Sequence, residues 1–195
     1  MNKTKRILIK LVMFFMIILA GSYCFLAYGA YFSFDTSQRE IAIAAVTSSP
    51  NLPDDFVKLY MATHPGLEES FRRTFASKVF GDESDCPCQD AAADLAVKMA
   101  SGKIYKIAQL TFFLEEYVTQ RQCLEFSLNN TVFAYNTNNI QEATRYYYNK
   151  ELENLNDDEM LELIAMSKNP YFFNKKNHPK RLAKQVERLR EKMKN

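Results

Sequence analysis

The sequence predicts an all-α protein in which one helical domain follows a single N-terminal transmembrane helix. Three observations lead to this prediction: an uncharged apolar run near the N-terminus, apolar residues recurring three or four positions apart in the rest of the chain, and segments bounded by residues that begin or end helices. The chain has no convincing strand, internal repeat or low-complexity linker. With 195 residues it is long enough for one domain with a sizeable core.

The N-terminal segment has the features of a membrane anchor. Residues 11–34 carry no charge, and about 20 apolar residues are enough for a helix to cross a bilayer core. Four basic residues precede this run, and basic residues stay on the cytoplasmic side, so we expect residues 1–10 to be a cytoplasmic basic tail and residues 35–195 an extracytoplasmic domain. The expected location is the cell inner (cytoplasmic) membrane, crossed once. The alternative is a signal peptide cleaved near "AYGA", although the apolar run is longer than a usual signal core.

The first two helices of the domain are predicted from their end signals. Asp35 and the two residues after it can cap a helix through residues 39–46. Pro53 and two acidic residues open the next helix, which Pro65 and Gly66 close.

The middle of the chain is predicted from apolar periodicity. A stripe of apolar residues four positions apart predicts a helix over residues 67–80; its members are Leu67, Phe71, Phe75 and Val79. A polar loop at 81–88 and a helix of small residues at 89–100 follow. The stretch 103–120 is apolar on most sides and is expected to be the central buried helix; its core residues are Leu110, Phe113 and Leu114.

The last helices combine both kinds of signal. Helices are expected at 120–128 and at 139–150, the second with a tyrosine cluster that we interpret as core. Asn156 is expected to cap a helix over 155–166, with Glu159 completing a capping box. Pro179 opens the final helix, whose apolar stripe is Leu182, Val186, Leu189 and Met193.

Charge and cysteine placement give further expectations. Residues 175–195 contain nine basic and two acidic residues, either as a surface against anionic headgroups or as the solvated face of the last helix. An extracytoplasmic domain can keep disulfides, so Cys123 is expected to pair with Cys86 or Cys88. With two histidines and one close cysteine pair, the sequence predicts no metal site, and we expect no cofactor and no nucleic-acid partner.

A known sequence pattern fits residues 110–193. The spacing from Glu115 to Lys150 matches without insertion or deletion; the matching groups are Leu114-Glu115, Ser127-Leu128-Asn129 and Tyr147-Tyr148-Asn149-Lys150. On these residues the chain resembles the second half of the peptidoglycan glycosyltransferase domain of penicillin-binding proteins, glycosyltransferase family 51. The resemblance implies a mainly helical fold with a lysozyme-like lobe, and a membrane-bound ligand, the disaccharide lipid called lipid II.

The resemblance breaks where the family keeps its chemistry. The family's motif E-D-x-x-F-x-x-H-x-G supplies a general base, and Thr63 or His64 stands at that position here. The motif G-S-T-I-T-Q-Q-x-x-K, which holds pyrophosphate and donor, falls near residues 89–98 and keeps Lys98. The glutamate of the motif R-K-x-x-E is replaced by Ile107, a residue without acid–base chemistry.

Several residues remain as candidates for a site. The surrogate carboxylates are Glu68, Glu69, Glu115 and Glu116, each interpreted as lying on a helix where a solvated or salt-bridged face is the alternative. His64 is a further candidate base, with a helix-end cap as its alternative. The candidate substrate contacts implied by the resemblance are Lys98, Asn129 and Lys150. Ala134 and Asn136 replace two glycines of the family's F-G-x-G loop, so a backbone shape that glycine favours is expected to be lost.

Three functions follow from this sequence. The leading hypothesis is a membrane-anchored, extracytoplasmic glycosyltransferase-like protein that has lost catalysis and binds lipid II, another lipid-linked glycan precursor or a cell-wall synthesis protein. The second is a divergent but active glycosyltransferase that polymerises lipid II with relocated carboxylates. The third is a helical, membrane-tethered interaction module that shares only the fold. Two carboxylates meeting in one cleft would favour the second hypothesis.

Overall fold

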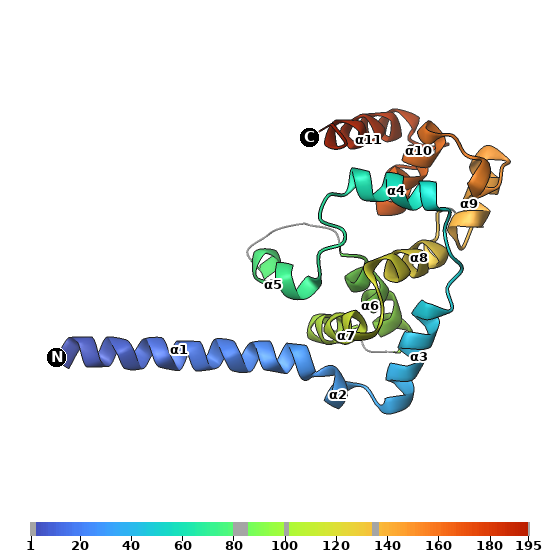
Figure 1. The fold of residues 1–195 in the computed structure, drawn as a ribbon. Coiled ribbons are helices and arrows are strands. Elements are labelled where there is room, and N and C mark those ends of the chain that lie inside the picture. The colour runs from blue at the N-terminus through green and yellow to red at the C-terminus, as the bar shows by residue number, and fades with distance from the viewer. Residues whose placement is uncertain (1–2, 80–85, 100–101, 134–136, 195) are drawn as a thin grey trace.

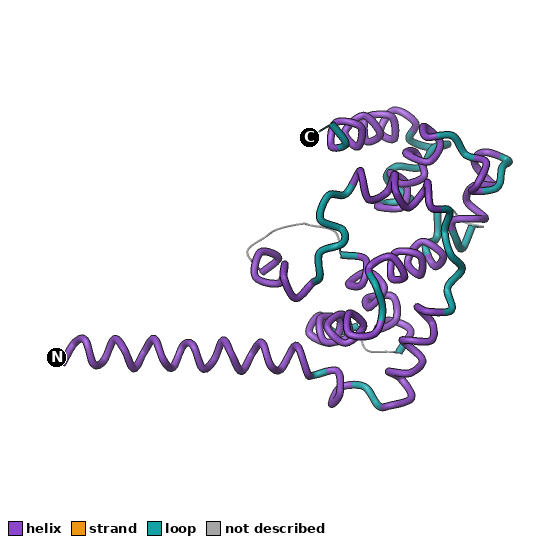
Figure 2. The backbone as a smooth tube through the Cα atoms, viewed as in Figure 1, coloured by secondary structure: helices purple, strands orange, loops and turns teal. Residues whose placement is uncertain are grey.

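A computed structural model describes residues 3–79, 86–99, 102–133 and 137–194. Within these ranges every regular element is a helix (Figures 1 and 2), which confirms the predicted fold class. The elements are α1 (Lys3–Tyr28), α2 (Ala30–Ser33), α3 (Thr36–Thr47), α4 (Asp54–Thr63), α5 (Phe71–Val79), α6 (Pro87–Lys98), α7 (Ile104–Tyr117), α8 (Gln120–Asn130), α9 (Ile140–Tyr148), the 3₁₀ helix η1 (Leu152–Asn154), α10 (Asp157–Lys168) and α11 (Pro179–Lys192). Most of the predicted polar loop at 81–88, together with Ala134 and Asn136, lies outside the described residues.

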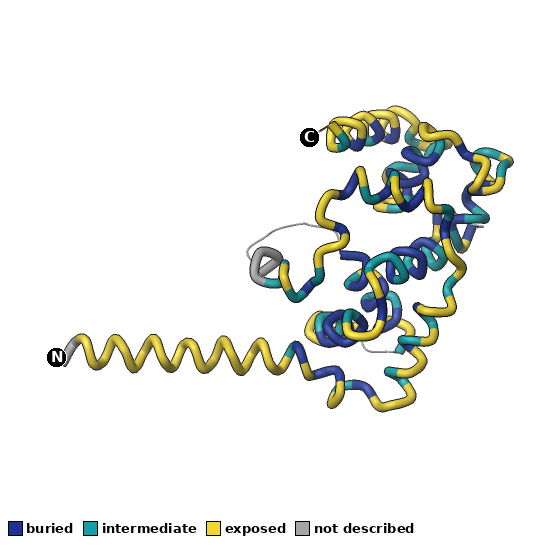
Figure 3. Tube along the Cα trace, viewed as in Figure 1, coloured by how far each residue is buried: buried dark blue, intermediate teal, exposed yellow. Residues whose placement is uncertain are grey.

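The N-terminal helix α1 projects from the rest of the molecule, and its surface is exposed along most of its length (Figures 1 and 3). The most apolar 18-residue window of Lys5–Tyr28 has a mean hydropathy of 2.3, so the helix is long and apolar enough to cross a membrane. The predicted transmembrane span is residues 11–34, but α1 ends at Tyr28. Ala30 and Phe34 are buried in the domain, so the end of the apolar run belongs to the core.

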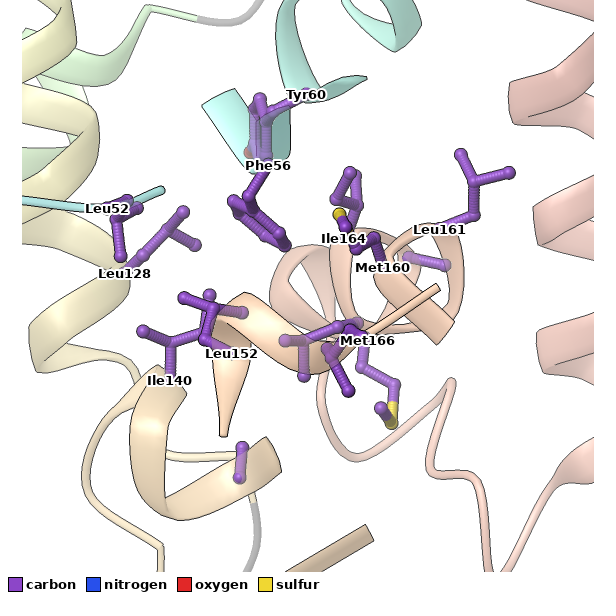
Figure 4. Packing of buried hydrophobic residues seen from close by; sticks show 14 of the residues in the cluster. Leu52, Phe56, Tyr60, Leu128, Ile140, Leu152, Met160, Leu161, Ile164 and Met166 are labelled. Atoms are coloured by element: carbon purple, nitrogen blue, oxygen red, sulfur yellow. The ribbon is translucent and has the colours of Figure 1, made fainter. Parts of the chain in front are cut away.

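The domain has two hydrophobic cores that share α8. The distal lobe consists of α4, α9, η1, α10 and α11, and α8 contributes Leu124 and Leu128 to it. Figure 4 shows Leu128 beside Leu52 and Ile140 in this core. The anchor-side lobe consists of α2, α3, α5, α6 and α7, and α8 contributes Cys123 and Phe126 to it. Helix α8 therefore buries residues in both directions and connects the two lobes.

Helix α7 is the central helix of the anchor-side lobe, as the sequence predicts. Its residues 109–114 are all buried, among them Leu110, Phe113 and Leu114. A disulfide between Cys88 and Cys123 joins α6 to α8 in the same lobe, with the two Cα atoms 4.9 Å apart.

Local signals set several helix ends. Asn156 and Glu159 form the predicted capping box at the start of α10. The stripe predicted for α11 is buried at Leu182, Val186 and Leu189, which leaves the basic residues of this helix on its exposed face.

The helix predicted over residues 67–80 is wrong at its start. Residues 65–69 form a turn, and α5 begins at Phe71. Gly66 has a φ of 89°, a conformation that glycine adopts easily, and Glu115 accepts a hydrogen bond from the backbone nitrogen of Phe71 at 2.5 Å. Leu67 then packs in the distal lobe and Phe71 in the anchor-side lobe, so the predicted stripe is split between the two cores.

Candidate functional site

A polar cleft of about 390 Å³ lies between the two lobes. Helices α6 and α8 contribute one part of its lining, and α4 and the end of α10 contribute another. The polar residues that line it are Asp90, Asp94, Ser127, Thr131, Ser167 and Lys168. Because the cleft lies where the two cores meet, a ligand there contacts both lobes.

Asp94 and Ser127 are the groups in this cleft best prepared for a ligand. Asp90 and Asp94 are four residues apart on α6, which puts both on one face of the helix. Burial raises the pKa of the Asp94 carboxyl above its ordinary 3.8, and the charge of Lys98 opposes that rise. On α8, the Ser127 hydroxyl is buried and has no hydrogen-bond partner among the described residues. A buried hydroxyl without a partner is costly, so a polar ligand group there is favourable.

An apolar groove of about 730 Å³ adjoins the polar cleft. Asp90 and Ala93 line both, so α6 is their shared wall. The rest of the groove is mainly apolar and includes Phe71, Phe75, Ile104 and Ile107, together with Leu26 near the end of α1. The groove therefore reaches from the polar cleft to the helix that has the length and composition of a membrane span.

Glu115, one of the predicted catalytic carboxylates, is part of the framework. Its Oε1 accepts hydrogen bonds from the Phe71 backbone and from Nε2 of Gln120, each at 2.5 Å. Burial raises the pKa of Glu115, and hydrogen bonds from Phe71, Arg72 and Gln120 oppose the rise. The carboxylate holds the first turn of α5 against α7 and does not line the cleft.

Glu68, Glu69 and His64, three of the predicted candidate site residues, lie outside the polar cleft. Glu68 and Glu69 lie in the turn before α5, not on a helix as predicted, because α5 starts later than the periodicity indicates. They line an open depression together with His64. His64 itself is buried, and its Nδ1 lies 2.8 Å from the Thr63 hydroxyl and 3.1 Å from the Tyr60 carbonyl oxygen. It is the C-cap residue of α4, which agrees with the helix-end alternative.

The three predicted substrate contacts do not reach the cleft. The Lys98 ammonium donates to Oδ1 of Asn130 at 2.9 Å, and Asn129 donates to the Pro50 carbonyl oxygen at 2.8 Å. Lys98 and Asn129 line one groove, which α8 separates from the cleft because their contacts lie on its other face. Lys150 is elsewhere, paired with both oxygens of Glu159 at 2.6 and 2.8 Å.

Sequence reasoning missed Asp90, Asp94 and Ser127. Asp90 and Asp94 fall in the stretch 89–98, which was interpreted as the remnant of a phosphate-holding motif. A signal was present, since two aspartates four residues apart on a helix of small residues mark one polar face. Ser127 belongs to a group that matches the family pattern, but no sequence signal indicates its buried hydroxyl without a partner among the described residues, because that depends on packing between helices.

Comparison with known proteins adds one positive finding. Residues 95–194 match the family model described as Transglycosylase. This region begins at Leu95 in the last turn of α6 and continues to Lys194, so it includes Ser127 and Lys168 of the cleft, whereas Asp90 and Asp94 lie just before it. A search among curated proteins finds no match.

Proposed function

Because this chain belongs to the transglycosylase family, the peptidoglycan glycosyltransferase domain, we propose that it is an extracytoplasmic, membrane-anchored protein that binds a lipid-linked glycan precursor without polymerising it. The observation that supports this most is the shared wall of the polar cleft and the apolar groove at Asp90 and Ala93. A precursor such as lipid II has a polar sugar head and an apolar tail, and each part meets a surface of its own kind.

The shape of the site favours the precursor over a protein partner. The groove begins beside Leu26 on α1, so a lipid tail lying in it stays next to the proposed membrane span. The sugar groups then lie in the cleft beside Ser127 and Asp94, and Lys168 is the basic side chain that lines the cleft. A cell-wall synthesis protein, the other ligand expected from the sequence, has no comparable need for an apolar groove directly beside a polar cleft.

Two positions support the proposed loss of catalysis. Ile107, where the resemblance places an acidic group, lines the apolar groove. Thr63 and His64, where it places the general base, are buried and hydrogen-bonded to each other. A general base contributes about 10²–10⁴-fold to such a reaction, and a charge-stabilising group about 10²–10³-fold. Losing both brings the rate close to background.

The binding proposal is tested with full-length protein in lipid nanodiscs and labelled lipid II. Wild-type protein is expected to bind, and Ala93→Trp to weaken binding at least about tenfold, since the large ring fills the shared wall. Val97→Trp is the matched control, because Val97 is on the same helix and 68% exposed. Equal binding by Ala93→Trp and wild type, with both variants folded, would contradict the proposal.

A second candidate function is a divergent polymerase that uses Asp94 as general base. Asp90 and Asp94 line the same cleft, which is the arrangement expected to favour an active enzyme. The raised pKa of Asp94 favours it too, because perturbed carboxyls often mark catalytic sites. Incubation with labelled lipid II and gel analysis distinguishes the two functions, and our proposal predicts no glycan chains. Chains that are lost in Asp94→Asn would establish the polymerase instead. Chains lost only in Glu68→Gln, Glu69→Gln or Glu115→Gln would establish a polymerase with its carboxylate at that position.

A further inference from the structure

The distal lobe has a second surface with the character of a saccharide site. It is a shallow pocket of about 340 Å³. The residues directly after α8, helix α9 and the connection from α10 to α11 form it. Its principal residues are Val132, Tyr146, Tyr171, Asn174, Lys176 and Asn177. We call this surface the aromatic shelf.

The aromatic shelf exposes rings that would normally be covered. Tyr171 is 75% exposed and Tyr146 is 45% exposed, with Val132 beside them at 56%. Clustered exposure of this kind marks a binding surface. Helix α9, which carries Tyr146, lies at the end of the molecule away from α1 (Figure 1), so a bilayer around α1 does not cover the shelf.

The backbone of the aromatic shelf is already ordered. Oδ1 of Asn174 accepts hydrogen bonds from the backbone nitrogens of Lys176 and Asn177 at 3.0 and 3.1 Å. Its Nδ2 donates to the Tyr147 hydroxyl at 2.9 Å, and that hydroxyl donates to the Phe133 carbonyl oxygen at 3.2 Å. This loop is thereby tied to α9, and a ligand binds without the cost of ordering it.

The aromatic shelf also has positive charge next to its rings. The Lys176 ammonium lies 3.6 Å from the centre of the Tyr146 ring. The Arg181 guanidinium lies 4.6 Å from the centre of the neighbouring Phe172 ring. Because Lys176 already covers one face of the Tyr146 ring, a ligand that fits this surface presents a flat apolar face to Tyr171 and negative charge to Lys176.

We propose that the aromatic shelf binds the polymerised glycan strand of peptidoglycan. The C–H face of a sugar ring stacks on Tyr171, and hydroxyl and acetamido groups at the ring edge hydrogen-bond with the Asn177 amide. The carboxylates of the strand's peptide stems meet Lys176. The inference rests on the family to which the chain belongs, which supplies the glycan chemistry, and is independent of what fills the cleft.

The test is co-sedimentation of full-length protein in detergent micelles with purified, lipid-free peptidoglycan sacculi. Wild type is expected to sediment with them, and Tyr171→Ala to bind about three- to tenfold more weakly because a stacking ring is lost. Tyr171→Phe keeps the ring and should bind like wild type. Tyr105→Ala removes an exposed ring from α7 and is the matched control. Thermal unfolding of each variant verifies its fold.

Charge is tested separately with Lys176→Gln, which should lose affinity for sacculi and keep its affinity for neutral chitin. A wild-type protein that stays in the supernatant, or a Tyr171→Ala variant that sediments like wild type, overturns the proposal. Equal loss of chitin and sacculus binding in Lys176→Gln overturns the role of the carboxylates. Lipid II binding separates the two proposals: Tyr171→Ala should retain it, whereas Ala93→Trp should lose it and still sediment with sacculi.

Discussion

Gln109 and Gly29 make the contact that fixes the end of α1 to the domain. Gln109 is fully buried in α7, and its Nε2 donates to the Phe25 carbonyl oxygen at 3.1 Å. Carbonyl groups at a helix end lack partners within the helix, so this side chain satisfies one of them. A Cβ atom at Gly29 would lie 1.9 Å from the same nitrogen. The Gln109 amide therefore bonds directly to α1, and the junction leaves no room for a methyl group at Gly29.

Gly29→Ala should destabilise the protein by about 1–3 kcal/mol, because the added methyl group overpacks the junction and displaces Gln109. Thermal unfolding in detergent measures the change. Gly21→Ala is the control, since a Cβ there has no neighbour within 4 Å. An equal melting temperature for Gly29→Ala and wild type would show that the junction can relax at no cost.

The raised pKa of Asp94 is expected to make the stability of the folded protein depend on pH. Burial disfavours its charged form, so the folded protein holds a proton on Asp94 at pH values where the unfolded chain has released it. Stability is therefore expected to fall as pH rises from about 3.8 through the higher folded pKa, and the penalty is complete above that value. Asp94→Asn should be more stable than wild type at pH 7 and similar to it at low pH.

Unfolding in denaturant from pH 4 to pH 7 measures this difference. Asp55→Asn is the control, because the Asp55 side chain is 86% exposed. The raised pKa assigned to Asp94 would be contradicted if the stability difference between Asp94→Asn and wild type did not change with pH.

At the scale of elements, α8 is the part that makes the two lobes one domain. It gives Leu124 and Leu128 to one core and Phe126 to the other, and its disulfide at Cys123 fixes α6 beside it. The same pair of helices builds one side of the cleft. The disulfide therefore holds the positions of Asp94 and Ser127 relative to each other.

Cys123→Ser should lower the free energy of unfolding by about 2–4 kcal/mol, because the disulfide closes a loop between residues 35 positions apart. Denaturant unfolding of the oxidised proteins measures this loss, with Cys24→Ser on exposed α1 as the control. Peptide mapping without reduction should recover a peptide that joins Cys88 to Cys123. Three free thiols at Cys86, Cys88 and Cys123 would contradict the bridge.

Helix ends were predictable where their cause is local. Asn156 and Glu159 are three residues apart, so their capping box can be recognised from the sequence and is present. The start of α5 was not predictable, because Glu115 on a distant helix caps it. The cleft was not predictable either, because it also depends on contacts between helices that are distant in the sequence. The sequence shows which face of α6 carries Asp94. It does not show that α6 packs beside α8, the helix that carries Ser127, because that contact depends on tertiary packing.

At the scale of the whole molecule, the apolar surface of α1, the polar cleft and the aromatic shelf lie in different parts of the structure. The exposed apolar helix α1 is at one end and the aromatic shelf, through α9, is at the other (Figure 1). The cleft lies between the lobes, and its apolar groove leads back to Leu26. This order suits a protein that faces lipid on one side and glycan on the other.

The topology predicted from the basic N-terminal residues places all lobes outside the cytoplasm. Alkaline phosphatase fused after Asn195 should be active, and green fluorescent protein fused there and exported in unfolded form should be dark. The reverse pattern would contradict both the location and the proposed access to lipid II.

The burial of Ala30 and Phe34 means that the chain passes from α1, the candidate membrane span, directly into the core of the domain. If α1 spans a bilayer, we expect this packing to make the domain turn together with the helix that carries it. The mouth of the apolar groove would then stay at a constant height over the headgroups. A lipid-linked sugar drifting sideways in the leaflet would reach that mouth by a two-dimensional search, with its local concentration raised by confinement to the same surface.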